Sequence, residues 1–298
     1  MSHIVHYTNC PVCGSEDFHK VFTVKDYTVS AGYFVIEECT HCSLRFTQDV
    51  PDEQSIGQYY LSEDYISHSN TAKGLINRVY HFVRKRTLAH KRKLIQKATG
   101  LSKGCILDLG CGTGSFVSEM KLSGWDVTGL EPDPGARKLA KEMYELDIAG
   151  ADEFYRLPAE GFDAITLWHV LEHVHDPEKY IRQLKKILKE KGRIFIAVPN
   201  YTSLDAAIYK EAWAAYDVPR HLYHFSPRSM DLLMKKHDLK ILAYKPMWYD
   251  SFYISLLSSK YKNGKSGYIS ATLNGLRSNM AAFRNIKKCS SLVYIIGK

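Results

Sequence analysis

Short apolar runs alternate with amphipathic segments from residue 105 to the end of the chain. The runs are four or five residues long, and Val, Ile and Leu recur in them. Runs of this length predict strands, whereas apolar residues spaced three and four apart predict helices. The expected strands are Cys105–Leu109, Asp126–Leu130, Ala164–Leu167, Ile194–Val198, Lys240–Tyr244 and Leu292–Ile296, and the expected helices are Phe116–Ser123, Pro134–Tyr144, Pro177–Glu190 and Pro227–His237. Strands that alternate with helices in this way are typical of a doubly wound, mostly parallel α/β sheet.

A different pattern fills the first 50 residues, where cysteines stand in two close pairs. Cys10 and Cys13 form one C-x2-C pair, Cys39 and Cys42 form the other, and 25 residues separate the two pairs. The stretch between them predicts two short strands, Phe18–Val24 and Tyr33–Glu38. Four thiolates around one ion make a closed tetrahedral zinc site that leaves no position for substrate. A zinc ribbon with a structural metal is therefore expected here, and His41, inside the second pair, is expected to be a bystander.

These patterns divide the chain into three parts. They are a zinc-ribbon module at residues 1–50, a Tyr-rich linker with a basic amphipathic helix at 51–98, and an α/β domain at 99–298. The helix is expected over Leu75–Ala98, with an apolar seam of Ile76, Val79, Val83 and Thr87. The tyrosines of the linker are Tyr59, Tyr60 and Tyr65. Within the α/β domain, residues 248–288 predict a helical insertion.

Charge is distributed unevenly along the chain, whose net charge is +8. Residues 78–97 hold eight Lys or Arg and no acid, and residues 235–298 hold twelve Lys or Arg against two acids. Such segments attract phosphates, nucleic acid or lipid head groups, or they are simply solvated helix faces. No apolar run reaches the ~20 residues of a membrane span, and the N-terminus lacks the pattern of a signal peptide. A cytoplasmic protein is therefore expected.

A glycine-rich turn follows the first strand of the α/β domain. Cys105–Leu109 runs directly into Gly110-Cys111-Gly112-Thr113-Gly114 and then into a helix. Glycines let the backbone approach a ligand closely, and the helix N-terminus favours an anionic group. Glu131 closes the next strand, where an acid accepts hydrogen bonds from ribose hydroxyls in nucleoside-binding sheets. The pattern predicts a cofactor that contains a nucleoside.

The motif reads Asp-x-Gly-x-Gly-x-Gly from Asp108, rather than Gly-x-Gly-x-x-Gly, and it resembles the first motif of class I S-adenosylmethionine-dependent methyltransferases. Phe162–Val174 and Leu188–Ile196 resemble the segments of that family after its fourth strand and before its fifth. The resemblance implies a Rossmann-like fold with a seven-stranded sheet and S-adenosylmethionine (SAM) as cofactor.

The resemblance also implies a role for individual residues of the cofactor site. Gly110, Gly112 and Gly114 would line the methionine end of SAM. Asp108 would hold the loop and the amino group of SAM, and Glu131 would bind its ribose. Trp168, at the end of the fourth strand, either faces the sulfonium or belongs to the core.

Histidines gather after two of the expected strands. His169 and His173 follow the strand Ala164–Leu167, and His221 follows the strand Ile194–Val198. Ligands of open α/β sheets bind at the carboxyl ends of strands. Methyl transfer to a hydroxyl, amine or carbon acid needs a base that titrates near the working pH, as histidine does. The base is therefore expected among these three histidines, while Glu172 either orients one of them or starts the next helix favourably.

The order of the modules along the chain resembles that of methyltransferases of deoxysugar and surface-glycan pathways. This resemblance limits the class of methyl acceptor to be expected. The leading prediction is a small anionic acceptor, such as a nucleotide-sugar or glycan precursor, whose phosphate Arg220 would clamp. Sugar C-methyltransferases of this layout have Glu-His where this chain has Arg220-His221, which argues against carbon methylation.

Three alternatives remain open. One is an RNA methyltransferase, although acids outnumber bases in the first 50 residues. Another is an O-methyltransferase of a quinone or other lipophilic acceptor, with residues 248–288 resting on a membrane surface through their aromatic and lysine side chains. The third is a SAM-binding protein without catalysis.

Overall fold

The computed structural model describes residues 3–60, 75–265 and 267–298, without the side chains of residues 75–83. Tyr65 and the side chains of the seam residues Ile76, Val79 and Val83 lie outside this description. The chain divides into two compact units. The first holds Met1–His68, Leu171–Tyr180 and Ala197–Tyr294, and the second holds Ser69–Val170, Ile181–Ile196 and Ile295–Lys298.

A six-stranded sheet has the strand order β11-β12-β9-β8-β6-β7. Its strands are β6 (Cys105–Leu109), β7 (Asp126–Leu130), β8 (Phe162–Trp168), β9 (Leu188–Pro199), β11 (Lys240–Pro246) and β12 (Ser291–Gly297). The register of β6 is parallel on both sides, since Cys105 pairs with Asp126 and Ile106 pairs with Ala164. The expected α/β fold is confirmed. Six strands form the sheet in the described residues where seven were expected, and Leu130 makes one further parallel bridge to Ala149.

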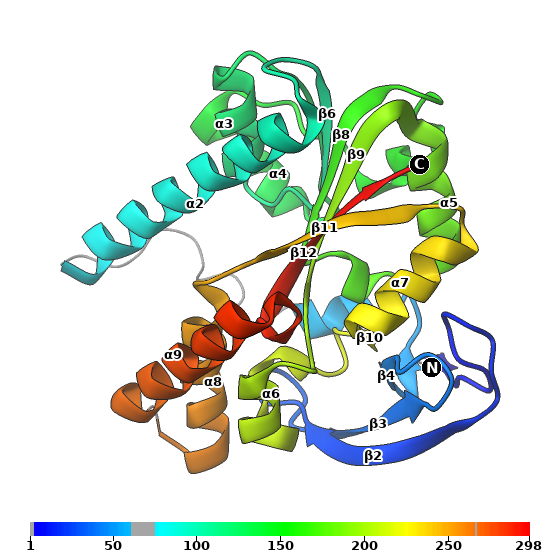
Figure 1. Ribbon diagram of the computed structural model, residues 1–298, viewed down its shortest axis with the longest axis vertical. Coiled ribbons are helices and arrows are strands. Elements are labelled where there is room, and N and C mark those ends of the chain that lie inside the picture. The colour runs from blue at the N-terminus through cyan, green and yellow to red at the C-terminus, as the bar shows by residue number, and fades with distance from the viewer. Residues whose placement is uncertain (1–2, 61–74, 266) are drawn as a thin grey trace. The chain divides into compact units, whose positions relative to one another are not determined.

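The helices of the second unit are α2 (Leu75–Thr99), α3 (Ser115–Leu122) and α4 (Pro134–Tyr144), followed by the 3-10 segment η2 (Ala151–Arg156). Asp133 caps α4 by accepting a hydrogen bond from the Ala136 amide at 2.8 Å. Figure 1 shows α2 running alongside α3. Arg92 of α2 donates to Glu119 of α3 at 2.8 Å. The basic helix therefore turns part of its charge toward its own unit.

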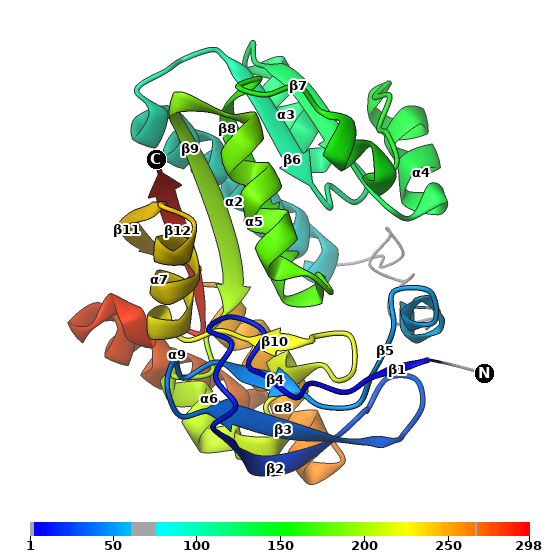
Figure 2. The same cartoon turned by 90° about the vertical axis from the view of Figure 1, so that its right-hand side faces the viewer.

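The first unit is built on a four-stranded antiparallel sheet of order β10-β4-β3-β2 (Figure 2). Its strands are β2 (Phe18–Lys25), β3 (Tyr33–Cys39), β4 (Arg45–Thr47) and β10 (Tyr223–His224), and a small ladder joins β1 (Ile4–Val5) to β5 (Val50–Pro51). Tyr223 of β10 pairs with Phe46 of β4. The sheet of the cysteine-rich module therefore takes its edge strand from a distant part of the chain.

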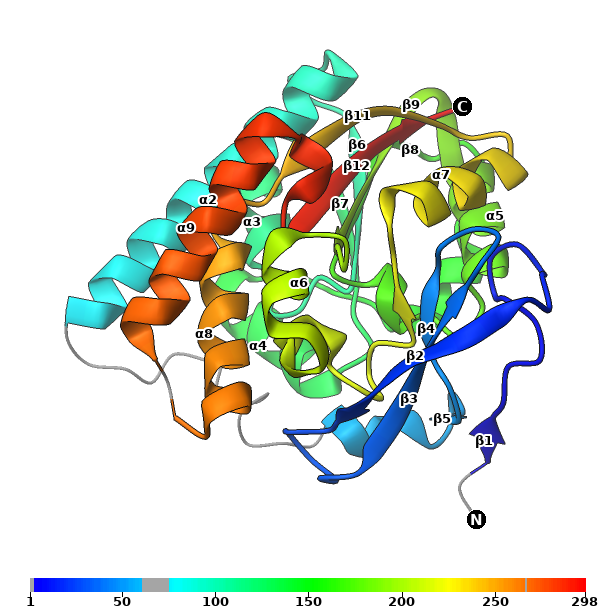
Figure 3. The same ribbon diagram turned by 60° about the horizontal axis from the view of Figure 1, so that its bottom comes forward.

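Helices α6 (Leu204–Tyr209), α7 (Pro227–Lys236), α8 (Asp250–Asn263) and α9 (Tyr268–Arg284) complete the first unit. Figure 3 shows α8 and α9 side by side. Five short 3-10 segments connect the elements: η1 (Ile56–Tyr60), η3 (Leu171–His173), η4 (Lys210–Ala212), η5 (Ala214–Tyr216) and η6 (Ile286–Lys288). Trp213 and Tyr216 pack in one core with Val24 and Ile36 of the sheet. In the described ranges, no helix has both the length and the apolarity to cross a bilayer.

Helix α5 (Pro177–Ile187) has residues in both units. The sequence predicted that this helix would continue to Glu190, and this end is wrong. Leu188, whose side chain is fully buried, is already the first residue of β9. An apolar residue at this place satisfied both the helical period and the strand pattern, so periodicity alone could not mark the boundary.

Candidate functional site

The glycine loop after β6 has backbone conformations that few residues other than glycine adopt. Gly110 and Gly112 have φ angles of 62° and 55°. A Cβ atom at Gly110 would lie 2.6 Å from Cγ2 of Val170, so that position needs glycine for packing. A Cβ atom at Gly112 would meet no heavy atom within 4 Å. The backbone of Gly112 therefore borders open space that a ligand could fill.

Glu131 fixes the shape of this loop. One carboxylate oxygen accepts from the Gly112 amide at 2.8 Å, and the other accepts from the Asp133 amide at 3.0 Å. The side chain is only 8% exposed, and this burial raises the pKa of Glu131 above its ordinary value. Each carboxylate oxygen keeps a further lone pair, so the group can still accept from a ribose hydroxyl.

Asp108 lies on β6, two residues before the glycine loop, and is buried. Its carboxylate accepts from the Thr166 hydroxyl at 2.6 Å. Burial raises the pKa of Asp108 to about 7, against the opposing effects of the Thr166 hydrogen bond and the charge of Lys91. A buried carboxylate of this kind is stabilised in its ionised form by a cation, such as the ammonium group of a bound ligand.

Trp168, at the end of β8, contacts a lysine that the sequence analysis did not single out. The Lys91 ammonium lies 4.0 Å from the centroid of the indole ring, a cation–π distance. The ring meets Phe116 edge-on at 5.6 Å. The next residue, His169, has a φ angle of 59°, in the left-handed region. Strain of this kind at a strand end is a common feature of functional sites.

In the first unit, His173 and His221 form a close pair. Their ring centroids are 4.6 Å apart and their planes are nearly perpendicular. Nδ1 of His173 lies 3.0 Å from the Arg220 carbonyl oxygen, and Nδ1 of His221 lies 2.8 Å from the Ala215 carbonyl oxygen. Because a carbonyl oxygen can only accept, Nδ1 of His221 carries a proton. Nδ1 of His173 also lies 3.0 Å from the Tyr60 hydroxyl oxygen, so it either donates to the Arg220 carbonyl or accepts from Tyr60.

Acidic groups surround this histidine pair. Burial, together with the charge of His221, lowers the pKa of His173 to about 4. Asp217 places a carboxylate oxygen 3.8 Å from Nε2 of His221. Glu172 is fully buried, and its ligand atom lies within 4.8 Å of those of the two histidines. The donor types of this set suit proton transfer, and they also suit a divalent cation.

The guanidinium of Arg220 is engaged by groups of the protein itself. Nε donates to one oxygen of Asp217 at 3.0 Å, and Nη2 donates to the other oxygen. Nη1 points to the Tyr59 carbonyl at 3.4 Å. The planar fork that would bind a phosphate is therefore engaged by Asp217, so the structure gives no support to the phosphate clamp.

The backbone around His221 is held by β4 of the cysteine-rich module. The Thr47 hydroxyl donates to the His221 carbonyl at 2.7 Å, and the Thr47 amide donates to the Leu222 carbonyl at 2.9 Å. The Leu222 amide in turn donates to the Glu172 carbonyl at 2.8 Å. These bonds bring His221 beside His173. Sequence reasoning missed Thr47, since nothing in a three-residue strand signals its partner.

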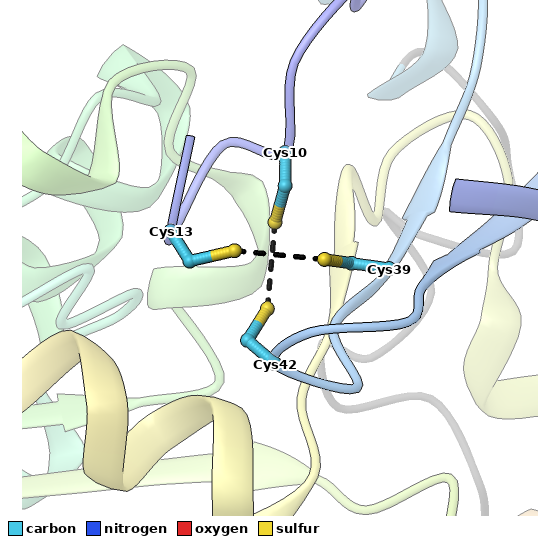
Figure 4. Close-up of side chains that lie close together, drawn as sticks. All are labelled: Cys10, Cys13, Cys39 and Cys42. Carbon is cyan, nitrogen blue, oxygen red and sulfur yellow. Dashed lines mark hydrogen bonds between the residues drawn. The ribbon is translucent and has the colours of Figure 1, made fainter. Parts of the chain in front are cut away.

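The four cysteines meet at one point, as Figure 4 shows. The Sγ atoms of Cys10 and Cys42 are 3.4 Å apart, and those of Cys13 and Cys39 are 3.5 Å apart. All four ligand atoms lie within 4.8 Å of one another. Zn–S bonds of ~2.3 Å in a tetrahedron place sulfurs about 3.8 Å apart, so the thiols fit a zinc ion. His41 is not among these clustered ligands.

The structure thus brings together some of the predicted site residues and separates others. Asp108, the three loop glycines, Glu131, Trp168 and His169 all belong to the second unit. His173 and His221 pair in the first unit, and the four cysteines form their own cluster there.

Comparison with known proteins identifies the class. Residues 80–244, more than half of the chain, match the family model described as a methyltransferase domain. The chain therefore belongs to this family. The fold class expected from the sequence, a Rossmann-like α/β methyltransferase fold, is confirmed.

Individual relatives are similar over shorter stretches. The ubiquinone biosynthesis O-methyltransferase of Actinobacillus pleuropneumoniae serotype 7 is 37% identical over 118 residues, covering 36% of this chain and 50% of the relative. The human mitochondrial ubiquinone biosynthesis O-methyltransferase is 27% identical over 164 residues, covering 49% of this chain and 44% of the relative. The chain thus spans about half the length of the curated relatives it matches.

One solved structure resembles the chain over nearly its whole length. It is the 1,6-didemethyltoxoflavin-N1-methyltransferase of Burkholderia thailandensis, with a TM-score of 0.50 and 12% sequence identity. The likeness covers 92% of this chain and 99% of that chain, and at this identity it concerns the fold alone.

Proposed function

We propose that this protein is a SAM-dependent O-methyltransferase of a small acceptor. The observation that carries the proposal is the glycine loop clasped by Glu131, which lies within the matched methyltransferase domain. Gly110, Gly112 and Gly114 would hold the methionine end of SAM, and Glu131 would accept from its ribose hydroxyls. When bound, SAM supplies a methyl group on a sulfonium, a good leaving group.

Asp108 and Trp168 would complete the cofactor site. The raised pKa of the buried Asp108 carboxyl indicates that the protein alone stabilises its ionised form poorly. The ammonium group of SAM would stabilise that form. Trp168 already contacts one cation, the Lys91 ammonium, on its ring face. An indole that faces a sulfonium would use the same attraction.

The acceptor proton would be taken by a histidine. His221 and His173 form a close pair of imidazoles, and histidine is the side chain that most often serves as a general base. His173 follows Trp168 by only five residues in the sequence. His169 remains a candidate through its position at the end of the fourth strand and its left-handed backbone.

The comparisons favour a phenolic acceptor over the sugar nucleotide that the chain layout suggested. The two curated relatives described above are named ubiquinone biosynthesis O-methyltransferases. Neither of the curated relatives described above is named for a glycan substrate, and the Arg220 guanidinium expected to bind its phosphate is engaged by Asp217. A phenol has a pKa of about 10, so a neutral imidazole beside it is a suitable base. We propose a quinone-type or other lipophilic phenol as the acceptor.

A zinc ion held by Cys10, Cys13, Cys39 and Cys42 belongs to this proposal as a structural element. Four thiolates leave no position for substrate, so the metal would take no part in methyl transfer. It would hold β4, and β4 holds the backbone of His221.

The test measures methyl transfer from labelled SAM to two probes, a prenylated catechol and a mixture of nucleoside-diphosphate sugars. We expect label in the catechol, lost in Gly112→Arg and strongly reduced in His221→Ala. His19→Ala, an exposed histidine of β2, is the matched control and should keep full activity. Label in the sugars instead would overturn the acceptor assignment. SAM binding without transfer to either probe would overturn the proposed activity.

A further inference from the structure

Helix α9 presents large apolar side chains outward. Ile269 and Phe283 are 79% and 78% exposed, and Leu273, Leu276 and Met280 between them are also exposed. The spacings along this row are four, three, four and three residues, so the five side chains form one stripe on one face of the helix. A surface helix of a globular protein normally turns such a stripe toward the core.

The opposite face of α9 is made of small or polar residues, and it is the buried one: Ala271, Gly275, Ser278, Asn279 and Ala282. It packs on α8, whose buried residues include Ser251, Ser255, Ser258 and Ser259. A Cβ atom at Gly275 would lie 2.8 Å from the ring of Phe252, so the two helices approach closely there.

Polar contacts lock α9 in this orientation. Asn279 accepts from the Ser251 hydroxyl at 3.0 Å and donates to the Trp248 carbonyl at 2.9 Å. Ser278 donates to the buried carboxylate of Asp205 at 2.6 Å. Rotating the helix to bury the apolar stripe would break all three bonds and leave buried polar groups unsatisfied. The outward stripe is therefore specified by the packing.

Exposed aromatic residues also lie at the start of each helix of the hairpin. The ring of Trp248 stacks on Phe283 with centroids 4.6 Å apart. Tyr249 and Tyr253 at the start of α8, and Tyr268 at the start of α9, are all at least half exposed. We call the stripe and these aromatics the hairpin surface. Large exposed apolar side chains gathered on one helical hairpin are typical of an interaction site.

The charge around the hairpin surface indicates what covers it. Residues 248–288 hold seven Lys or Arg and one acid, Asp250. Lys260, Lys262, Arg277 and Arg284 are exposed. Two copies joined through this surface would bring these positive charges together, whereas an anionic bilayer would neutralise them. Helices with an apolar face and flanking Lys or Arg lie in the bilayer interface.

We propose that the α8–α9 hairpin docks this protein on an anionic lipid bilayer. The apolar stripe of α9 would enter the boundary between head groups and acyl chains, and the flanking Lys and Arg side chains would contact the head groups. The helices, of 14 and 17 residues, lie in the interface and do not span it. Such docking would bring the protein to the phase in which a lipophilic acceptor dissolves.

The test is flotation of the full chain with vesicles of phosphatidylcholine alone or with 30% phosphatidylglycerol. We expect binding to the anionic vesicles that is at least about tenfold stronger and that weakens in high salt. Replacing two stripe residues, Ile269→Ser with Phe283→Ser, should lower the binding by about tenfold or more. Arg277→Glu with Arg284→Glu should also weaken it, by a smaller factor.

Leu122→Ser is the matched control, because Leu122 is 85% exposed and belongs to α3 of the second unit, whereas the hairpin belongs to the first. It should bind vesicles like the wild type. The proposal is overturned if the Ser pair binds like the wild type, or if no vesicle binds the chain. It is also overturned if sedimentation shows a dimer that the Ser pair dissociates, since a second copy then covers the surface.

Vesicle binding is measured without methyl transfer, so this proposal and the proposed activity fail separately. All hairpin variants should transfer methyl groups to a water-soluble catechol at the wild-type rate. Circular dichroism should show unchanged helix content, since each substituted side chain is exposed.

Discussion

The glycine loop and the histidine pair are assembled in different ways. The loop and the Glu131 side chain that accepts hydrogen bonds from its backbone come from one continuous stretch, residues 105–131. In this stretch strand, glycine-rich turn, helix and strand follow one another directly in the sequence. The histidine pair joins His173 to His221 through hydrogen bonds from Leu222 and from Thr47, a residue of the cysteine-rich module. A site formed by one continuous motif can be predicted from the sequence. A site assembled from three segments depends on tertiary packing, which no local sequence pattern predicts.

The most severe test of the loop is Gly112→Arg. The Arg side chain would fill the open space beside Gly112 and would also strain a backbone with φ of 55°. We expect SAM binding to fall below detection by calorimetry, a loss of about 10³-fold or more. Gly112→Ala is the control and should lose much less affinity, because its single methyl group meets no neighbour within 4 Å. Wild-type affinity in the Arg variant would show that the cofactor binds elsewhere.

Substitutions in the histidine pair should lower kcat, whereas substitutions in the glycine loop should weaken the binding of SAM. His221→Ala removes the proposed base and should lower kcat by about 10²- to 10⁴-fold. The dissociation constant of SAM should stay unchanged, since the loop residues are untouched. His173→Ala, tested alongside, shows which of the two imidazoles takes the proton. If both variants keep wild-type kcat, His169 becomes the remaining histidine candidate.

Much of the fold was accessible from the sequence because its signals are local. β6 and β7 have the predicted bounds, and α4 begins at Pro134, where Asp133 supplies the cap. Strands β4 and β10 were not predicted. They are three and two residues long, and each is stabilised by a partner far away in the sequence.

The candidate site was predicted unevenly for the same reason. The loop residues and the cysteines follow from spacing, which the sequence displays directly. Lys91, which contacts Trp168, was missed because a lysine in a basic helix gives no sign of facing inward. The sequence also did not predict which face of α9 is exposed. Its apolar residues have an ordinary helical spacing, and only the contacts of Ser278 and Asn279 show that this face points outward.

The link between the cysteine module and His221 can be broken at the metal. Cys42→Ser should release zinc and loosen β4, so that His221 loses the hydrogen bond from Thr47. A displacement of about 1 Å at a catalytic group costs about 10²-fold in rate, and we expect a fall in kcat of that order. Zinc content by metal analysis and kcat measured on the same sample check the coupling. Cys105→Ser, a cysteine outside the cluster, should change neither quantity.

A separate prediction concerns Asp108 and the stability of the cofactor-free protein. Burial raises the pKa of Asp108 from 3.8 to about 7, so the folded state holds its proton up to a higher pH than the unfolded state. The stability linked to this group is present below about pH 4 and is lost as pH rises through 7. Asp108→Asn should therefore unfold at higher urea than the wild type at pH 8, by up to about 4 kcal/mol in the free energy of unfolding. The difference should vanish below pH 4.

Asp163, at the start of β8, serves as a control because its pKa is shifted in the direction opposite to that of Asp108. Burial opposes its ionisation, but hydrogen bonds from Lys189 and from the Cys105 amide, both at 2.8 Å, outweigh that burial and lower its pKa. Asp163→Asn should therefore destabilise the protein above pH 4, where Asp108→Asn stabilises it. Asp108→Asn should also weaken SAM binding, because the neutral amide no longer attracts the ammonium group. A variant that gained stability at pH 8 and kept full affinity would show that the Asp108 charge serves no ligand.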